Sequence, residues 1–248
     1  IKYHLIMKNE DKYFMKIAIQ EAKKASDAVF PNPKVGCIIT KNGKIISKGF
    51  HKKFGGSHAE KIAINNLNLK IDQATMYVTL EPCAHTGKTK PCIDLIDYKM
   101  FKRVVIASSD PNPLSENGIK ILKKKNIEVT TGVYKKKSKK INKRFFTYHE
   151  KKRPYVIIKC AMTLDGFIAE TNGKSKWITN EESRNSVHKL RSTCDAILIG
   201  NKTANSDNPS LTSHRQGKNP KIVLIDPSNN ASKNLKLFDK DPIIFNNE

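Results

Sequence analysis

Two motifs organise this chain: His58-Ala59-Glu60 and, after 21 intervening residues, Pro82-Cys83-Ala84-His85-Thr86-Gly87-Lys88-Thr89-Lys90-Pro91-Cys92. The imidazole of His58 and the thiols of Cys83 and Cys92 are ligands that suit a tetrahedral Zn²⁺. Catalytic zinc sites have three protein ligands and leave the fourth position open to water, whereas structural sites use four. The motifs therefore predict a catalytic zinc site, with a structural zinc or a set of unrelated buried cysteines as the alternative.

Glu60 lies two residues after His58, at the start of a predicted helix, where its carboxylate can reach metal-bound water without being a ligand. The order H-x-E…P-C is typical of the zinc deaminases. In that chemistry zinc lowers the pKa of its bound water to about 7, and a carboxylate moves protons, a role worth roughly 10²- to 10⁴-fold in rate. We therefore predict that Glu60 is the catalytic proton carrier.

The segments around these motifs predict an α/β sandwich. Apolar residues at helical spacing predict a helix over 11–25, which Pro31-Asn32-Pro33 ends, and strands over 35–40 and 44–47 are joined by the hairpin turn Asn42-Gly43. The elements expected next are a helix after His58, a strand over 75–80, a helix from about Cys92, a strand over 103–107, a helix near 118–125 and a strand over 128–131. The helices at His58 and Cys92 should both begin near one edge of the sheet and bring the ligands together.

A basic segment divides the chain. Residues 135–153 hold ten lysines and arginines against one acid, Glu150. We expect a solvated connecting helix, packed by Ile141, Phe145 and Phe146, with nucleic-acid contact as the alternative. After it a new sheet should begin, with strands over 155–162, 195–200, 221–226 and 243–245, and a helix over 181–191 capped by Thr179 or Asn180. The predicted parts are a zinc-dependent deaminase domain over 7–134, a basic connecting segment over 135–153 and a second domain over 154–248.

Composition limits the function classes. The 248 residues suffice for two modest domains, and the net charge of +23 favours phosphate-bearing partners, although a drift toward lysine and asparagine would give the same charge. Five cysteines, two of them assigned to metal, predict a reducing, cytoplasmic setting without disulfides. No stretch has the length of a membrane span. Because Met7 precedes a polar helix start, residues 1–6 are expected to be an upstream extension or a fragment edge, and a homo-oligomer stays open.

Taken together, the motifs closely resemble a bifunctional riboflavin-biosynthesis deaminase/reductase family. The deaminase resemblance spans about 7–150 and rests on Pro31-Asn32-Pro33, His58-Ala59-Glu60, the eight-residue gap between Cys83 and Cys92, and Asp110-Pro111-Asn112-Pro113. The second half looks like the start of the reductase domain, through Lys159-Cys160-Ala161-Met162-Thr163-Leu164-Asp165-Gly166, Ser175-Lys176-Trp177-Ile178-Thr179, Asp195-Ala196-Ile197-Leu198-Ile199-Gly200 and Asp207-Asn208-Pro209-Ser210-Leu211-Thr212. The resemblance implies an α/β chain: a cytidine-deaminase-like three-layer domain followed by the N-terminal part of a dihydrofolate-reductase-like domain.

For the first domain, the resemblance implies Zn²⁺ on His58, Cys83 and Cys92. Glu60 would move protons during hydrolytic removal of the 2-amino group of a phosphoribosylated diaminopyrimidinone. The substrate-binding positions expected are Asn32, His51, His85, Lys88 and Asn112, of which His51 and His85 are chosen because they flank the site in sequence. Lys88 would bind the ribose phosphate, with a plain surface lysine as the alternative.

For the second domain, the resemblance implies NADPH-dependent reduction of the ribosyl group to a ribityl chain. The matching cofactor positions are Ala161, Trp177, Thr203 and Asp207, and the substrate positions are Ser175, Arg191, Leu211 and His214. His214 stands where the family usually has an arginine, and Pro227 replaces a cofactor-contacting serine. No Gly-rich turn that could cradle cofactor phosphates follows Phe245, so we expect this reductase domain to be incomplete.

Two rival functions share some of these features. A tRNA-adenosine type deaminase has the same zinc site and would explain the basic charge, but it typically carries P-C-x-x-C instead of an eight-residue gap. A catalytically inactive basic scaffold that binds RNA would not need intact ligands and Glu60. We therefore expect a small phosphorylated pyrimidine as the partner, and neither nucleic acid nor a membrane.

Overall fold

The computed structural model describes residues 2–68, 70–87, 90–115 and 117–247, and the chain divides into two compact units, Ile1–Ile157 and Ile158–Glu248. Each unit contains its own sheet, the first five-stranded and the second three-stranded. No helix among the described residues is long and apolar enough to cross a membrane.

The first sheet has the strand order β2-β1-β3-β4-β5. β1 pairs antiparallel with β2 and β3, whereas β3, β4 and β5 run parallel. The predicted hairpin between β1 and β2 is confirmed, because Asn42 and Gly43 both adopt positive φ angles, 50° and 71°, as a two-residue turn requires. The strands are β1 (Gly36–Lys41), β2 (Lys44–Phe50), β3 (Ala74–Val78), β4 (Phe101–Ile106) and β5 (Glu128–Thr131).

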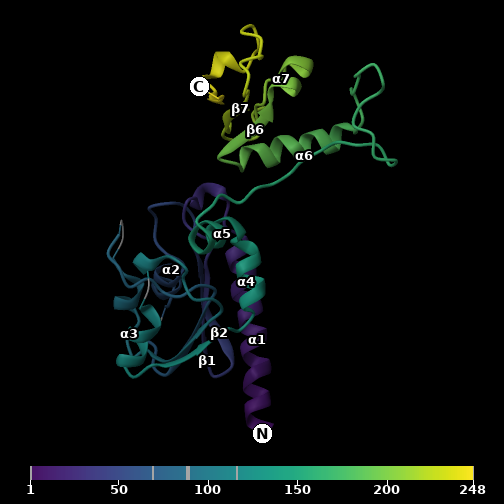
Figure 1. The fold of residues 1–248 in the computed structure, drawn as a ribbon. Helices are drawn as coiled ribbons and strands as arrows, with labels where there is room; N and C mark the ends of the chain where they lie inside the picture. The colour runs from purple at the N-terminus through teal and green to yellow at the C-terminus, as the bar shows by residue number, and fades with distance from the viewer. Residues whose placement is uncertain (1, 69, 88–89, 116, 248) are drawn as a thin grey trace. The chain divides into compact units, whose positions relative to one another are not determined.

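Helices cover both faces of this sheet and give it three layers (Figure 1). α1 (Lys2–Lys23) packs on the face of Ile38 and Tyr77, and α2 (Ala59–Asn65) and α3 (Gly118–Lys124) pack on the face of Ile39 and Met76. Successive residues of a strand point to opposite faces, so each buried strand supplies both cores. The predicted helices over 11–25, after His58 and near 118–125 are confirmed, and α1 begins earlier than expected.

Two glycines let the helices approach the sheet closely. A Cβ on Gly36 of β1 would lie 2.1 Å from the Ala18 carbonyl oxygen of α1, and one on Gly49 of β2 would lie 2.4 Å from the Ala59 carbonyl oxygen of α2. A larger residue at either position would clash with the helix backbone unless the helix moved away. Gly49 therefore sets the distance between the sheet and the helix that carries Glu60.

A buried ion pair anchors α1 to the sheet. Arg103 of β4 donates two hydrogen bonds of 2.8 Å to the two carboxylate oxygens of Asp11, and the Tyr77 hydroxyl donates to the same carboxylate at 3.1 Å. Arg103 and Asp11 are 7% and 4% exposed. A bidentate pair of this kind has one favoured geometry, so it fixes the register of α1 on the sheet.

The basic segment forms two helices, α4 (Lys135–Ile141) and α5 (Lys143–Lys151), where a single connecting helix was expected. Both lie in the first unit, and Ser138, Asn142 and Phe146 are buried in it. The side chain of Asn142 hydrogen-bonds both backbone groups of Lys34, which is why the chain bends there between the two helices and stays packed. The boundaries at 134 and 153 stay predictions.

The helix predicted from Cys92 is corrected by the structure to a single 3₁₀ turn, η2 (Cys92–Leu95). Ile96 has an extended backbone, with ψ of 98°, and its side chain is fully buried in the core. The chain therefore leaves the 3₁₀ turn at Ile96, and a second turn over residues 98–100 leads into β4. Other short 3₁₀ turns are η1 (Asp27–Val29), η3 (Pro113–Ser115) and η4 (Phe238–Lys240).

The second unit holds a parallel sheet of order β6-β7-β8, made of β6 (Ala196–Gly200), β7 (Lys221–Ile225) and β8 (Ile243–Phe245). Its helices are α6 (Glu181–Ser192) and α7 (Asn201–Asp207). Of the two caps proposed for α6, Asn180 is the one found, since its side-chain oxygen accepts from the Ser183 N–H at 2.9 Å. In the core of the second unit, Ile222 and Leu224 pack against Leu211, Leu235 and Leu237.

Two predictions for the second unit are wrong. Residues 155–162 were expected to form a strand, but they form none, and Ile158 is 90% exposed. A strand is held by ladder hydrogen bonds, and none of the described strands pairs with this segment. β6 was expected to be buried, but Leu198 is 61% exposed, because the core lies against the other face of β6, where Ile197 and Ile199 pack.

Candidate metal and catalytic site

Three side chains converge where α2 begins. His58 is the N-cap residue of α2, Cys83 follows β3, and Cys92 opens η2. The Nδ1 atom of His58 lies 3.2 Å from Cys92 Sγ and 3.5 Å from Cys83 Sγ, and the Cys92 N–H donates to Cys83 Sγ at 3.3 Å. All three candidate ligand atoms lie within 4.8 Å of one another.

This donor set fits Zn²⁺. One imidazole nitrogen and two sulfurs are the ligands that zinc prefers, and three of them leave one tetrahedral position for water. Among the described residues, no further histidine, cysteine or acidic group joins these three as a fourth ligand, which favours a catalytic over a structural zinc site. The first turn of α2 also directs its backbone dipole at this point, which favours negatively charged thiolates.

The two thiols affect each other's ionisation. The hydrogen bond with Cys92 lowers the pKa of Cys83, and the same contact raises the pKa of Cys92. The hydrogen bond between His58 Nδ1 and the Cys83 sulfur, which accepts it, raises the pKa of His58. Thiolate is the form that binds metal, so a divalent cation held between these atoms would favour the thiolate form of both cysteines.

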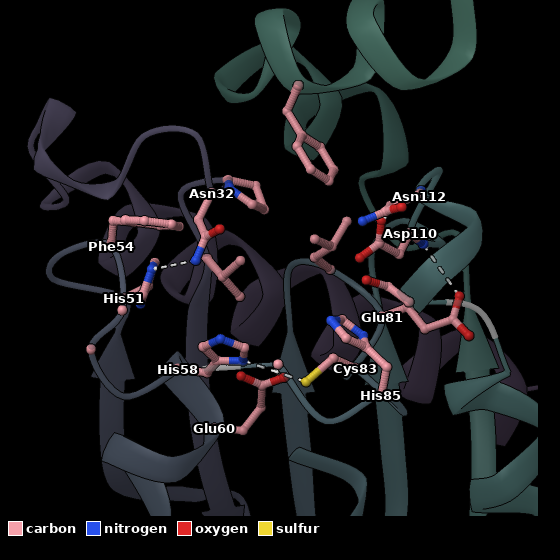
Figure 2. A pocket seen from close by; sticks show the side chains of 18 residues that line it. Asn32, His51, Phe54, His58, Glu60, Glu81, Cys83, His85, Asp110 and Asn112 are labelled. Carbon is pink, nitrogen blue, oxygen red and sulfur yellow. Dashed lines mark hydrogen bonds between the residues drawn. The ribbon is translucent and has the colours of Figure 1, made fainter. Parts of the chain in front are cut away.

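Glu60 lies in the first turn of α2, one residue inside the helix from Ala59 (Figure 2). Its side chain is 3% exposed, and burial raises its pKa to about 7, against the opposing effect of the charge on His58. A buried carboxylate that ionises near neutral pH can both accept and return a proton. A bound dication beside it would lower this pKa.

A cavity of about 180 Å³ opens over these groups (Figure 2). Its lining comes from several loops of the first unit and from α5, and combines polar groups with apolar walls. The lining residues are Asn32, Pro33, Val35, His51, Phe54, Gly55, Gly56, His58, Glu60, Leu80, Glu81, Cys83, His85, Gly87, Asp110, Asn112, Ser115 and Phe145.

His51 orients Asn32. The Nδ1 atom of His51 lies 3.0 Å from the Ser57 carbonyl oxygen, which can only accept, so Nδ1 carries the proton. The other ring nitrogen, Nε2, then accepts from Asn32 Nδ2 at 3.2 Å. Burial lowers the pKa of His51, which keeps the ring neutral. Figure 2 shows the Asn32 carboxamide with its nitrogen on His51, and its oxygen, which hydrogen-bonds to none of the described residues, can accept a hydrogen bond in the cavity.

The opposite wall is the loop that carries Asp110 and Asn112. The Asn112 side-chain oxygen accepts from the Leu114 N–H at 3.2 Å, which leaves its NH₂ group to donate. The loop is held by Glu81, whose carboxylate accepts from the Asp110 N–H at 3.2 Å and from the Ile119 N–H at 2.9 Å. Burial raises the pKa of Asp110 to about 6.

The structure brings most of the predicted first-domain positions to this cavity. Asn32, His51, His85 and Asn112 all line it, together with His58, Glu60 and Cys83. The Nδ1 atom of His85 is buried and has no hydrogen-bond partner among the described residues. Lys88 lies outside the described residues, so its proposed role stays a prediction.

The lining residues that were not predicted as site residues include Phe54, Glu81, Asp110, Ser115 and Phe145. Glu81 carried a signal, because a charged residue that directly follows a buried strand and precedes Pro82-Cys83 points to a buried partner. Asp110 was noticed only as part of a loop. Phe145 was interpreted as packing for a connecting helix, and its sequence context holds no sign of the cavity.

The predicted second-domain positions are less closely grouped. Arg191 of α6 donates to the Thr212 carbonyl oxygen at 3.3 Å, which joins it to the segment of Leu211 and His214, and the His214 ring lies 3.9 Å from that of His188. Leu211 is buried. Trp177 lies under Arg184, 4.4 Å from ring centroid to guanidinium, and Ser175 precedes it. Thr203 and Asp207 lie on α7, and Ala161 lies in the 155–162 segment. Among the predicted second-domain positions that the structure describes, a hydrogen bond joins Arg191 to the 211–214 segment.

Comparison with known proteins defines the class to which this chain belongs. Residues 8–108 match the cytidine and deoxycytidylate deaminase zinc-binding region, and residues 154–248 match the RibD C-terminal domain. The chain is therefore a cytidine-deaminase-like domain with a zinc-binding motif, followed by a portion of a dihydrofolate-reductase-like RibD C-terminal domain, and the predicted fold class is confirmed.

The chain belongs to the RibD family of riboflavin biosynthesis proteins. It is 45% identical over 220 residues to riboflavin biosynthesis protein RibD of Aquifex aeolicus and 45% identical over 235 residues to that of Buchnera aphidicola, covering 88% and 94% of this chain and 62% of each relative. A diaminohydroxyphosphoribosylaminopyrimidine deaminase/5-amino-6-(5-phosphoribosylamino)uracil reductase structure from Thermotoga maritima matches 98% of this chain and 71% of its own length, with a TM-score of 0.85 and 43% identity. The chain thus spans about three-fifths of the curated relatives it matches.

Proposed function

We propose that the first unit catalyses a deamination step of riboflavin biosynthesis, the hydrolytic removal of the 2-amino group of 2,5-diamino-6-ribosylamino-4(3H)-pyrimidinone 5′-phosphate. One observation carries the proposal: the ligand atoms of His58, Cys83 and Cys92 converge to within 4.8 Å beside the buried carboxylate of Glu60, in the wall of a cavity. Membership in the RibD family supports the substrate, which the name of the Thermotoga maritima relative also suggests.

His58, Cys83 and Cys92 would hold the metal. When bound, Zn²⁺ supplies a Lewis acid that makes water acidic enough to provide hydroxide near neutral pH. Glu60 takes a proton from the attacking water and passes protons to the ring nitrogen and the leaving nitrogen. The carbon–nitrogen bond at C2 then breaks, ammonia leaves, and the oxygen of water stays as the new carbonyl. A pKa near 7 suits Glu60 to both directions of proton transfer.

The cavity offers hydrogen bonds of both kinds to a pyrimidine. The Asn32 oxygen, with its nitrogen held on His51, is available to accept from a substrate amino group, and the Asn112 NH₂ group is available to donate to a carbonyl. A ring with both groups on its edge, as in a diaminopyrimidinone, satisfies both amides, whereas an analogue without them leaves an amide of the cavity wall unpaired. We propose Lys88 as the phosphate ligand on the basis of its place in the sequence alone.

Ammonia release tests this function. The purified chain loaded with zinc should release ammonia from the phosphorylated diaminopyrimidinone and none from an adenosine-containing RNA hairpin of the kind that a tRNA deaminase uses. The Glu60→Gln variant is the matched control, since it should keep its zinc and lose turnover. Ammonia from the RNA, or from Glu60→Gln at the wild-type rate, would contradict the proposal.

We also propose NADPH as the cofactor of the reductase domain to which residues 154–248 belong, as the family match over these residues suggests. Ala161, Trp177, Thr203 and Asp207 are the proposed cofactor positions, and Ser175, Arg191, Leu211 and His214 the substrate positions. Trp177 is the only tryptophan in the chain, so its fluorescence should be quenched on titration with NADPH and much less with NADH. Fluorescence that does not respond to NADPH would argue against Trp177 as a contact.

A reducing cytoplasm is the proposed setting. All five cysteines are free thiols, and two of them are candidate metal ligands that must stay reduced to bind zinc.

A further inference from the structure

We infer that α4 and α5 form one wall of the deaminase cavity and take part in substrate binding. Asn142 positions the loop that carries Asn32, and Phe145 packs against the pyrimidine ring of the substrate. The inference rests on the proposed function, and it gives a role in that site to a basic segment whose composition suggested only a connector. Two features of this helix pair carry it.

The first feature is the hold of Asn142 on the 31–35 loop. Asn142 lies where α4 ends and α5 begins and is 6% exposed. Its side-chain oxygen accepts from the Lys34 N–H at 2.8 Å, and its NH₂ group donates to the Lys34 carbonyl oxygen at 2.9 Å. One side chain thus pairs with both backbone groups of one residue, as a neighbouring strand would. Lys34 lies between the lining residues Pro33 and Val35 and two residues after Asn32, so this pairing fixes the loop that presents the Asn32 amide.

The second feature is the reach of α5 into the cavity. Phe145 lines the cavity, three residues after Asn142, and the Arg144 guanidinium lies 4.9 Å from the centroid of the Phe30 ring at the start of the same loop. The polar groups that line the cavity occupy its metal end and the walls of Asn32 and Asn112 (Figure 2). A flat heteroaromatic ring also needs an apolar surface against its face, and Phe145 and Phe54 supply the aromatic rings.

Part of the positive charge of the basic segment is used in contacts with nearby aromatic and acidic side chains. Lys137 lies over the Tyr134 ring at 4.0 Å, Lys139 lies over the Phe146 ring at 4.9 Å, and Lys139 also pairs with Glu150. These cations stabilise the helix pair through contacts with its own aromatic and acidic groups. The segment therefore has an intramolecular use for part of its charge, and its apolar and amide side chains make the contacts with the site.

The test compares full-length variants of neighbouring residues. Phe145→Ala should raise KM for the phosphorylated diaminopyrimidinone roughly tenfold or more, with kcat within about threefold of wild type, because it removes binding common to substrate and transition state. Two controls share its helix: Phe146→Ala, which removes a 4% exposed ring that does not line the cavity, and Tyr148→Ala, which removes a 62% exposed one. The first should lower the melting temperature without changing KM, and the second should change neither.

The effect of Asn142→Ala on the loop is measured by hydrogen exchange, which does not depend on enzyme turnover. Amide hydrogen exchange over 31–36 should accelerate at least tenfold, zinc content should stay at the wild-type level, and KM should rise. Wild-type KM in Phe145→Ala overturns the substrate contact, and unchanged exchange in Asn142→Ala overturns the positioning role. If wild type released no ammonia, the proposed function would fail and the Phe145 contact with it, while hydrogen exchange would still decide for Asn142.

Discussion

At the scale of single residues, the site depends on a few groups whose chemistry is set by burial. Glu60 and Asp110 are carboxyls whose burial raises their pKa to about 7 and about 6, whereas burial lowers the pKa of His51. All three shifts favour the neutral form, as expected where charge is taken out of water. Burial therefore keeps the His51 ring neutral and brings the ionisation of the Glu60 and Asp110 carboxyls closer to neutral pH than that of exposed carboxyls.

Replacing a candidate ligand should remove the metal. Cys92→Ser should lower bound zinc from about one per molecule to a small fraction, because a serine hydroxyl is a poor zinc ligand at neutral pH. Elemental analysis of the dialysed protein measures this. Cys160→Ser is the control, since Cys160 is exposed in the second unit and should leave zinc unchanged. Full zinc in Cys92→Ser would remove it from the ligand set.

Proton transfer by Glu60 predicts a pH dependence with a definite sign. Glu60 must be ionised to accept the proton of water, so kcat/KM should be constant above its pKa and fall about tenfold per pH unit below it. Since burial raises this pKa to about 7 and a bound cation lowers it, the acid-side inflection should lie at or below about 7. A pH–rate profile measures it. Residual activity of Glu60→Gln should lack this inflection, and an unchanged inflection would assign it to another group.

At the scale of elements, the position of α2 decides whether the site is assembled. α2 carries Glu60 and begins at His58, and its distance from the sheet is set by Gly49 in β2. α1 on the other face is set by Gly36 and by the Asp11–Arg103 pair. Both helices use a close backbone approach that a larger residue in the strand would prevent.

Gly49→Ala should therefore disturb the site from a distance. The new Cβ would lie 2.4 Å from the Ala59 carbonyl oxygen and 2.5 Å from the Ala63 nitrogen, so α2 must shift. We expect a loss of about 1 to 3 kcal/mol in the free energy of unfolding and weaker zinc binding, measured by denaturant titration and by competition with a chelator. Gly200→Ala, which meets open space, is the matched control. Equal zinc affinity in the two variants would contradict the prediction, because it would show that the packing of α2 on the sheet does not affect metal binding.

Removing only one partner of the buried Asp11–Arg103 ion pair, which anchors α1, should lower the free energy of unfolding. Asp11→Asn leaves Arg103 buried with weaker partners, and the expected loss is about 3 kcal/mol in the free energy of unfolding. Thermal and denaturant unfolding measure it. The control is Asp72→Asn, which breaks the exposed ion pair with Lys41 and should barely change the melting temperature. A melting temperature for Asp11→Asn equal to that of the control would show that the buried pair contributes little.

At the scale of the whole molecule, the two units have separate cores. The clusters that bury α1, α2 and the five-stranded sheet contain residues of the first unit alone, and the cluster around Leu224 contains residues of the second. Each unit can therefore be expected to keep its packing when the other is altered.

Two fragments test where the deaminase domain ends. A fragment of residues 1–157 should keep zinc and ammonia release, because it retains both cores together with Asn142 and Phe145. A fragment of residues 1–134, cut at the predicted boundary, should lose most ammonia release, since α4 and α5 are missing. Both are measured at equal zinc content. Full activity of the shorter fragment would place the boundary at 134 and contradict the role of the helix pair.

Much of the fold was predictable because local spacing encodes it. The Asn42-Gly43 turn, the alternating strands and helices, and the cap at Asn180 depend on residues close together in the chain. The predictions that failed depend on distant partners: the Cys92 helix is cut short by burial of Ile96, and residues 155–162 form no strand because a strand needs a neighbour.

The sequence by itself determined the chemistry of the candidate site. Ligand type, ligand order and the position of Glu60 two residues after His58 are properties of the chain, since a metal selects donor atoms and a helix presents nearby residues together. The tertiary structure alone decided the shape of the cavity. Asn142 and Lys34 are 108 residues apart, and Phe145 reaches the cavity only because α5 packs beside the 31–35 loop. Such contacts follow from how helices and loops pack on the sheet, which no local pattern encodes.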